Sequence, residues 1–183
     1  MSLKIKARLC DRSALRSMLD ELANNIGGHH ASAGPALAFV GILSGGAPIA
    51  DHLADRFAER FGFRPPVAYL DISLYRDDMI TTQDEPYSRV TEIPFAMRNK
   101  EIVLVDDVLF TGRTIRAALT SLLALGRPRL IRLAVAVDRG GHELPIQADY
   151  VGRRIEISEN EGIRVRVDGP EQDRGIYIVE AVS

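Results

Sequence analysis

Residues 102–114 read IVLVDDVLFTGRT, and this stretch decides the fold. Four apolar residues run into two adjacent acids, Asp106 and Asp107, and a short loop with Thr111 and Gly112 follows at once. An uninterrupted apolar run of this kind is typical of a strand that is buried on both faces of a parallel sheet. The spacing after the loop predicts a helix over residues 114–125, which Gly126 then ends.

The chain repeats this alternation of apolar strand and amphipathic helix. We expect further strands at residues 37–43, 67–75 and 129–137, and helices at residues 11–22 and 47–61. Buried strands separated by helices predict an α/β fold, in which helices cover both faces of a mostly parallel central sheet.

Three further segments have a different character. Residues 24–35 hold Gly, His, Ser and Pro and predict a loop, while residues 76–94 form a polar, turn-rich stretch that is too long for a simple connector. From Tyr150 onward, short strand-like runs alternate with charged residues. Because no repeat or linker interrupts the pattern, we expect a single domain over residues 1–183.

The composition is that of an ordinary soluble protein. The chain has 183 residues, is 46% hydrophobic and carries a formal net charge of -2, so its overall charge indicates no polyanion partner. Cys10 is the one cysteine, which excludes an intrachain disulfide and fits a reducing compartment; we expect it to be a small buried or partly buried residue and not a nucleophile. We find no signal-peptide pattern and no apolar run of membrane-spanning length, and therefore expect a cytoplasmic protein.

Polar loops follow three of the expected strands, at residues 44–46, 106–114 and 138–142. Ligands of parallel α/β sheets bind beyond the carboxyl ends of the strands. If the three loops lie on one edge of the sheet, they form one site.

The loop from Phe110 to Thr114 has the chemistry of a phosphate cradle. Unpaired backbone N–H groups and the positive end of the helix dipole meet there, and Gly112 permits a tight turn and a close approach. Thr111 and Thr114 add hydroxyl donors, and Arg113 adds positive charge. The Walker A pattern with its lysine and the dinucleotide pattern G-x-G-x-x-G are both absent.

Two carboxylates next to a phosphate site must have a target other than the phosphate. Asp106 and Asp107 can accept hydrogen bonds from the cis-diol of a sugar, so the stretch fits a ribose 5-phosphate. An alternative stays open, because receiver domains and many hydrolases also place acids at strand ends, where they hold magnesium.

Residues 102–114 resemble the 13-residue motif with which type I phosphoribosyltransferases bind phosphoribosyl pyrophosphate (PRPP). The likeness covers nearly the whole chain and is to the PyrR family, whose members regulate pyrimidine operons and usually also act as uracil phosphoribosyltransferases. It is carried by residues 70–78, 105–118, 125–128, 136–140, 143–146 and 148–152.

The resemblance implies a type I phosphoribosyltransferase fold with a mobile hood loop. The implied reaction converts uracil and PRPP to UMP and pyrophosphate, with Mg²⁺ bound through PRPP and no direct protein ligand. By position, Asp106 and Asp107 would hold the ribose diol. The 5′-phosphate would be held by Phe110, Thr111, Gly112, Arg113 and Thr114.

Other positions follow from the same resemblance. The pyrophosphate loop would be Ser44, Gly45 and Gly46, and a mobile loop that closes the site would begin at Arg76, Asp77 and Asp78. The base would lie against Val137, Asp138, Arg139 and Gly140. At Phe110 an aromatic residue is typical of PyrR, whereas purine-specific relatives often have an acid there.

The chain departs from the family pattern at the pyrophosphate loop. PyrR proteins usually read Thr-Arg-Gly, and this chain reads Ser44, Gly45 and Gly46. A charge-assisted contact contributes roughly 1.5–3 kcal/mol, so loss of the arginine predicts weaker use of PRPP. Glycine backbone N–H groups compensate in part, because they form good anion nests. An arginine returned to position 45 is expected to raise turnover.

A second departure concerns RNA. Where PyrR proteins usually have basic residues, this chain has Gly141 and Gln147, which predicts weak binding of pyrimidine-leader mRNA. The remaining candidates for RNA contact are Arg16, His142 and Arg153, and no role is assigned to His29 or His30.

The favoured function is therefore uracil phosphoribosyltransferase of the PyrR type, combined with regulation of pyrimidine biosynthesis genes. One alternative is a UMP- or UTP-sensing RNA-binding transcriptional attenuator with little or no catalytic activity. Another is a nucleotide-binding paralogue that takes a different base. The family implies a homodimer or a higher homo-oligomer.

Overall fold

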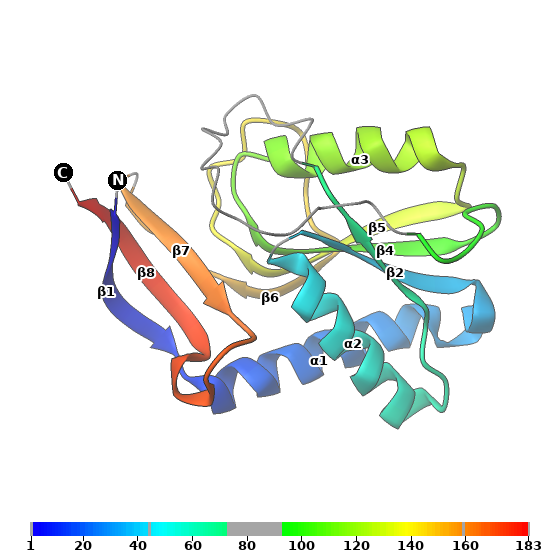
Figure 1. The fold of residues 1–183 in the computed structure, drawn as a ribbon, viewed down its shortest axis with the longest axis horizontal. Helices are drawn as coiled ribbons and strands as arrows, with labels where there is room; N and C mark the ends of the chain where they lie inside the picture. The colour runs from blue at the N-terminus through cyan, green and yellow to red at the C-terminus, as the bar shows by residue number, and fades with distance from the viewer. Residues whose placement is uncertain (1, 44, 73–92, 159, 183) are drawn as a thin grey trace.

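A computed structural model describes residues 2–43, 45–72, 93–158 and 160–182, and these form two β-sheets and three long helices (Figure 1). The larger sheet has five parallel strands in the order β3-β2-β4-β5-β6. Its strands are β2 (Leu37–Ile42), β3 (Val67–Leu70), β4 (Glu101–Leu109), β5 (Leu130–Asp138) and β6 (Tyr150–Arg154). The helices are α1 (Arg12–His30), α2 (Gly46–Phe61) and α3 (Arg113–Leu125).

Helices cover both faces of the larger sheet, which confirms the predicted α/β fold (Figure 1). Side chains alternate along each strand, so that Phe39 of β2 packs in the same cluster as the apolar residues of α1 and α2, whereas Val40 packs with those of α3. Because β2 and β4 lie in the middle of this sandwich, their apolar side chains are buried, with Val108 at the end of β4 only partly so. That explains why their sequences are apolar throughout rather than alternating.

The smaller sheet brings both ends of the chain together and was not anticipated as a separate unit. It is antiparallel, with the order β1-β8-β7, and consists of β1 (Ser2–Cys10), β7 (Glu161–Arg166) and β8 (Gly175–Val182). A short 3-10 helix, η3 (Glu171–Asp173), lies between β7 and β8. Cys10 is buried where β1 leads into α1, as predicted.

The prediction of a loop at residues 24–35 is wrong, because α1 continues to His30 and the 3-10 helix η1 (Ala31–Ala36) follows. Tertiary contacts override the low helix propensity of Gly27, whose missing Cβ leaves room for the ring of Phe61. Asp11 caps the start of α1, since its carboxylate accepts a hydrogen bond of 2.9 Å from the Ala14 N–H.

Several expectations fall on parts of the chain outside the described residues. These are the end of the expected strand at residues 67–75, the mobile loop beginning at Arg76, Asp77 and Asp78, and Ser44. Within the described residues, that strand already ends at Leu70. Among the helices of the described ranges, none has the length and apolar character needed to cross a membrane.

Candidate active site

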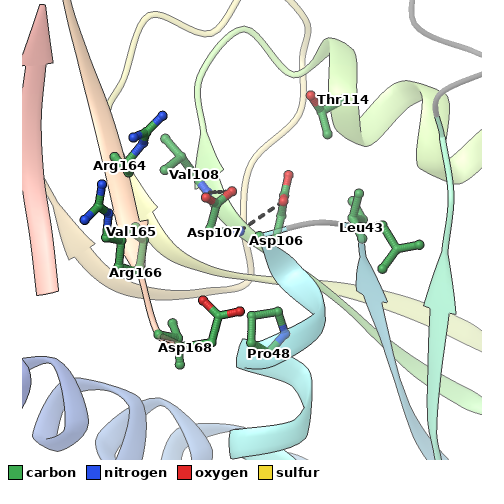
Figure 2. Close-up of a pocket in the computed structure, with 13 residues that line it drawn as sticks. Leu43, Pro48, Asp106, Asp107, Val108, Thr114, Arg164, Val165, Arg166 and Asp168 are labelled. Atoms are coloured by element: carbon green, nitrogen blue, oxygen red, sulfur yellow. Dashed lines mark hydrogen bonds between the residues drawn. The ribbon is translucent and has the colours of Figure 1, made fainter. Parts of the chain in front are cut away.

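A pocket of about 440 Å³ opens at the carboxyl ends of β2 and β4, where the sequence predicted a site (Figure 2). Gly45 borders it after β2, and Asp106 and Asp107 border it from the end of β4. A second pocket of about 490 Å³ is lined by the loop from Phe110 to Thr114 and by Arg139. Thr114 and Val108 line both pockets, so the three predicted loops do meet at one edge of the sheet.

Asp106 and Asp107 are held in place by their own backbone (Figure 2). An oxygen of the Asp106 carboxylate accepts the Asp107 N–H at 3.0 Å, and an oxygen of the Asp107 carboxylate accepts the Val108 N–H at 2.9 Å. Asp106 is buried, and Asp107 is partly buried. Two acids with fixed orientations therefore border the pocket, which is the arrangement that a sugar diol requires.

Gly45 and Gly46 pack directly against these acids. A Cβ at Gly45 would lie 2.4 Å from the carboxyl carbon of Asp107, and one at Gly46 would lie 2.1 Å from the carbonyl oxygen of Val105. Neither position can carry a side chain unless its neighbours move. Gly45 is also the N-cap of α2, so the positive end of that helix lies at the pocket, where it favours an anion.

The predicted phosphate loop has the expected geometry. Gly112 is the N-cap of α3 and has φ +89°, a left-handed conformation that glycine adopts without strain. The Thr111 hydroxyl accepts a hydrogen bond of 3.3 Å from the Arg113 N–H. The Arg113 guanidinium donates to Glu143 at 2.7 and 2.9 Å, so its charge is offset by a carboxylate to which the sequence assigned no role.

In the second pocket, Phe110 and Arg139 form a stacked pair. The Arg139 guanidinium carbon lies 3.7 Å from the centroid of the Phe110 ring, and 40% of Phe110 is exposed. The Arg139 Nε is the one buried side-chain nitrogen or oxygen without a hydrogen-bond partner in the described ranges. Gly141 has φ +71°, and a Cβ there would lie 2.7 Å from the Phe110 ring. The glycine that departs from the family pattern therefore makes room for this ring.

The other predicted base contacts differ in accessibility. Val137 is fully buried in the core, so its side chain cannot line the pocket. Asp138 is also buried, and its carboxylate accepts hydrogen bonds from the Gly140 N–H at 3.0 Å and from His142 Nε2 at 2.9 Å. Asp138 thus orders the start of the loop that carries Arg139.

The structure separates the three candidates for RNA contact. His142 is held against Asp138, Arg153 is exposed on β6, and Arg16 lines a different pocket between α1 and α2. Within the described ranges, no residue hydrogen-bonds to all three of these side chains, and among the three only His142 makes a side-chain hydrogen bond, with Asp138.

Sequence reasoning missed one wall of the first pocket. It is formed by β7 and the residues that follow, namely Arg164, Val165, Arg166, Val167 and Asp168 (Figure 2). The pattern Ile-Arg-Val-Arg-Val predicted a strand but gave no sign that its two arginines border the pocket. Only the position of the small sheet reveals this.

No group of three or more metal-ligating side chains occurs among the described residues. Asp106 and Asp107 are nevertheless suitable for a magnesium ion that is held mainly by substrate phosphates and water, since such ions need only one or two protein carboxylates.

Sequence comparison places these features in a known context. Residues 13–169 match the model of the phosphoribosyl transferase domain. A protein named Bifunctional protein PyrR from Pelotomaculum thermopropionicum is 45% identical over 178 residues, which cover 97% of this chain and 98% of that protein. A protein of the same name from Thermus aquaticus is 48% identical over 167 residues and covers 91% of each chain.

Solved structures share the fold at much lower identity. A hypoxanthine phosphoribosyltransferase from Trypanosoma cruzi in complex with IMP has a TM-score of 0.73 and 16% identity, over 96% of this chain and 91% of that one. A hypoxanthine phosphoribosyltransferase from Staphylococcus aureus has a TM-score of 0.70 and 22% identity, over the same shares. This likeness concerns the fold and not the base that is used.

Proposed function

Because the chain belongs to the PyrR family of type I phosphoribosyltransferases, we propose that it transfers the phosphoribosyl group of PRPP to uracil. One observation carries the proposal: the paired acids at the end of β4 share a pocket with the N-terminal end of α2, and Thr114 joins that pocket to the phosphate loop of α3. Two anion sites with a diol site between them match the 5′-phosphate, the pyrophosphate and the ribose of PRPP.

In the proposed complex, Asp106 and Asp107 accept hydrogen bonds from the ribose 2′- and 3′-hydroxyls. The backbone N–H groups and hydroxyls of Thr111, Gly112 and Thr114 hold the 5′-phosphate. Pyrophosphate lies at the N-terminal end of α2, next to Gly45 and Gly46. Mg²⁺ would be held through PRPP, with no direct protein ligand, and would neutralise charge on the leaving pyrophosphate.

The reaction is a substitution at C1 of the ribose. The bond between C1 and the pyrophosphate oxygen breaks with its electron pair on pyrophosphate, the bond between C1 and N1 of uracil forms, and N1 loses its proton. Phe110 cannot act as a base, so no side chain at that position takes this proton. The residues that fix both ends of PRPP bring the reacting atoms together, and the family's mobile loop, beginning at Arg76, Asp77 and Asp78, would keep water out.

The arginines of β7 offer a replacement for the one that the pyrophosphate loop lacks. Arg164 and Arg166 border the same pocket as Gly45 and Asp107. They bring positive charge to a pocket that otherwise holds acids, and thereby favour a polyanionic substrate. Arg139 and Phe110 form the corresponding wall of the base pocket.

We propose that binding of pyrimidine-leader mRNA accompanies catalysis and is weak. The name of the relatives, Bifunctional protein PyrR, supports a second role, and Arg153 is exposed for it. His142 is held against Asp138, and Gly141 and Gln147 bring no charge, so few cationic contacts with phosphate remain. The family also supports a cytoplasmic homodimer or higher oligomer built from single-domain chains, with UMP and UTP as ligands of the site.

The test is an assay of radiolabelled uracil with PRPP and magnesium. UMP should form, hypoxanthine should not replace uracil, and Asp107→Asn should reduce the rate at least tenfold, because a neutral amide is a weaker acceptor for the diol. Absence of UMP at high protein concentration would overturn the proposed activity, and tight uridine-nucleotide-dependent RNA binding at physiological salt would overturn the weak-binding proposal.

A further inference from the structure

Away from the candidate active site, a small basic pocket lies where α1, α2 and the segment between β7 and β8 meet. Its volume is about 180 Å³, and its lining contains no acidic residue. Four arginines and one histidine line it over an apolar floor of Leu15, Leu19 and Val167, and these basic residues are Arg12, Arg16, His52, Arg56 and Arg174.

Of the four arginines, two are paired with carboxylates and two have no carboxylate partner among the described residues. The paired ones are Arg12 and Arg56. The Arg12 guanidinium is bound to Glu171 through two contacts, of 2.6 and 2.8 Å. Arg56 pairs with Glu59 at 2.9 Å and lies 3.6 Å from Asp20.

The other two, Arg16 and Arg174, make no ion pair within the described ranges, and the Arg174 Nε donates only to the Gly169 carbonyl, at 3.1 Å. Two positive charges therefore remain uncompensated at one cavity, where they favour an anion.

From this we propose that the pocket binds a small phosphate-bearing anion, held by Arg16 and Arg174. Several guanidinium forks around one cavity suit the tetrahedral oxygens of phosphate. The cavity is smaller than the roughly 300–1,000 Å³ of sites for drug-sized ligands, so it suits a single phosphate or diphosphate group and not a whole nucleotide.

The position of this pocket connects it with the first one. Val167 lines both the basic pocket and the pocket at Asp106 and Asp107. Helix α2 begins at Gly46, beside the pocket of the two acids, and carries His52 and Arg56 into the basic pocket. An anion held between Arg16 of α1 and Arg174 of the small-sheet segment would fasten β7 against the helices. The pocket is thus suited to controlling how firmly the small sheet covers the active site.

The binding test uses inorganic phosphate as the probe, with sodium chloride at matched ionic strength as the reference. Titration calorimetry on Arg16→Ala/Arg174→Ala should show a phosphate affinity at this site reduced by about tenfold or more. The double variant Arg60→Ala/Arg127→Ala removes two exposed arginines that do not line the pocket, and should bind phosphate as the unmodified protein does.

The variant Thr114→Val distinguishes phosphate bound at the active site. It should weaken phosphate binding at the active site and leave phosphate binding at the basic pocket unchanged. Hydrogen exchange gives an independent readout, because phosphate should slow exchange in β7, η3 and β8 only where Arg16 and Arg174 are present. Arg16→Gln, a single change at an exposed position, serves if the double variant fails to fold.

Equal phosphate binding by the unmodified protein and the Arg16/Arg174 variants would overturn the proposal, and so would a response to RNA but not to phosphate. Neither outcome depends on the formation of UMP, so the site and the proposed catalytic activity can fail separately.

Discussion

Replacing Gly45 by alanine tests whether the contact between the pyrophosphate loop and Asp107 is essential. The new Cβ would lie 2.4 Å from the Asp107 carboxyl carbon and 2.5 Å from one of its oxygens, whereas ordinary contacts begin at 3.4 Å. The carboxylate must therefore move by about 1 Å, the difference between 3.4 and 2.4 Å. Such a shift is expected to weaken the 2.9 Å hydrogen bond that the Asp107 carboxylate accepts from the Val108 N–H.

A displacement of about 1 Å in a positioning group can cost on the order of 100-fold in rate. We expect kcat/KM for PRPP to fall by roughly that factor, which is about 2.7 kcal/mol of transition-state stabilisation. The backbone of Gly45, with φ -75° and ψ -36°, is accessible to alanine, so the effect arises from the contact and not from backbone strain.

The assay is the initial rate of UMP formation at varied PRPP concentration, combined with urea unfolding to show that the variant is folded. Gly28→Ala is the matched control, since Gly28 lies exposed on α1 with nothing within 4 Å of its missing Cβ. Activity of Gly45→Ala within threefold of the unmodified protein would refute the reasoning, because Asp107 would then tolerate displacement.

The same contact reverses an expectation from the family pattern. An arginine at position 45 was expected to raise turnover, but it brings the same Cβ against Asp107. In this backbone we expect Gly45→Arg to lower turnover.

Two further predictions concern stability. Gly46→Ala should lower the free energy of unfolding by about 1–3 kcal/mol in urea, because its Cβ would meet the Val105 carbonyl oxygen at 2.1 Å; an unchanged midpoint would show that the loop can move away. Burial, followed by the charges of His29 and Arg132, lowers the pKa of His30 below its usual 6.5. As the pH falls, His30 therefore binds a proton at a higher pH in the unfolded chain than in the folded protein. Its contribution to the free energy of unfolding is present at neutral pH and is lost as the pH falls below about 6.5. His30→Gln should weaken this dependence in urea titrations between pH 5 and 7.5, and an identical dependence in both proteins would contradict the assignment.

The central sheet and the first wall of the site could be predicted because their signals are local. The apolar run before Asp106 predicts a buried strand, which was confirmed, and the glycine and threonines that follow predict a tight turn into a helix, which was also confirmed. That this turn holds a phosphate stays a prediction. Gly112 adopts the positive φ that such a turn requires. In these cases the residue types that form the element also determine its chemistry.

His30 illustrates what the sequence could not predict. It was expected in a loop without a role, yet it is buried and lies 2.6 Å from Glu101 and 3.0 Å from the Tyr150 hydroxyl. A neutral imidazole satisfies both contacts, by donating from Nδ1 to the carboxylate and accepting from the hydroxyl at Nε2. These partners are 71 and 120 residues away in the sequence, so no local pattern reveals them.

The wall formed by β7 was missed for the same physical reason, and it changes how the site must be understood. β7 pairs with β8, and β8 pairs with β1, so the position of Arg164 and Arg166 depends on the N-terminal strand. The acids of β4 are held by their own backbone and need no such support. The site therefore combines a rigid half on the parallel sheet with a half that the chain ends hold in place. Changes in β1 should accordingly affect substrate affinity before they affect the geometry of Asp106 and Asp107.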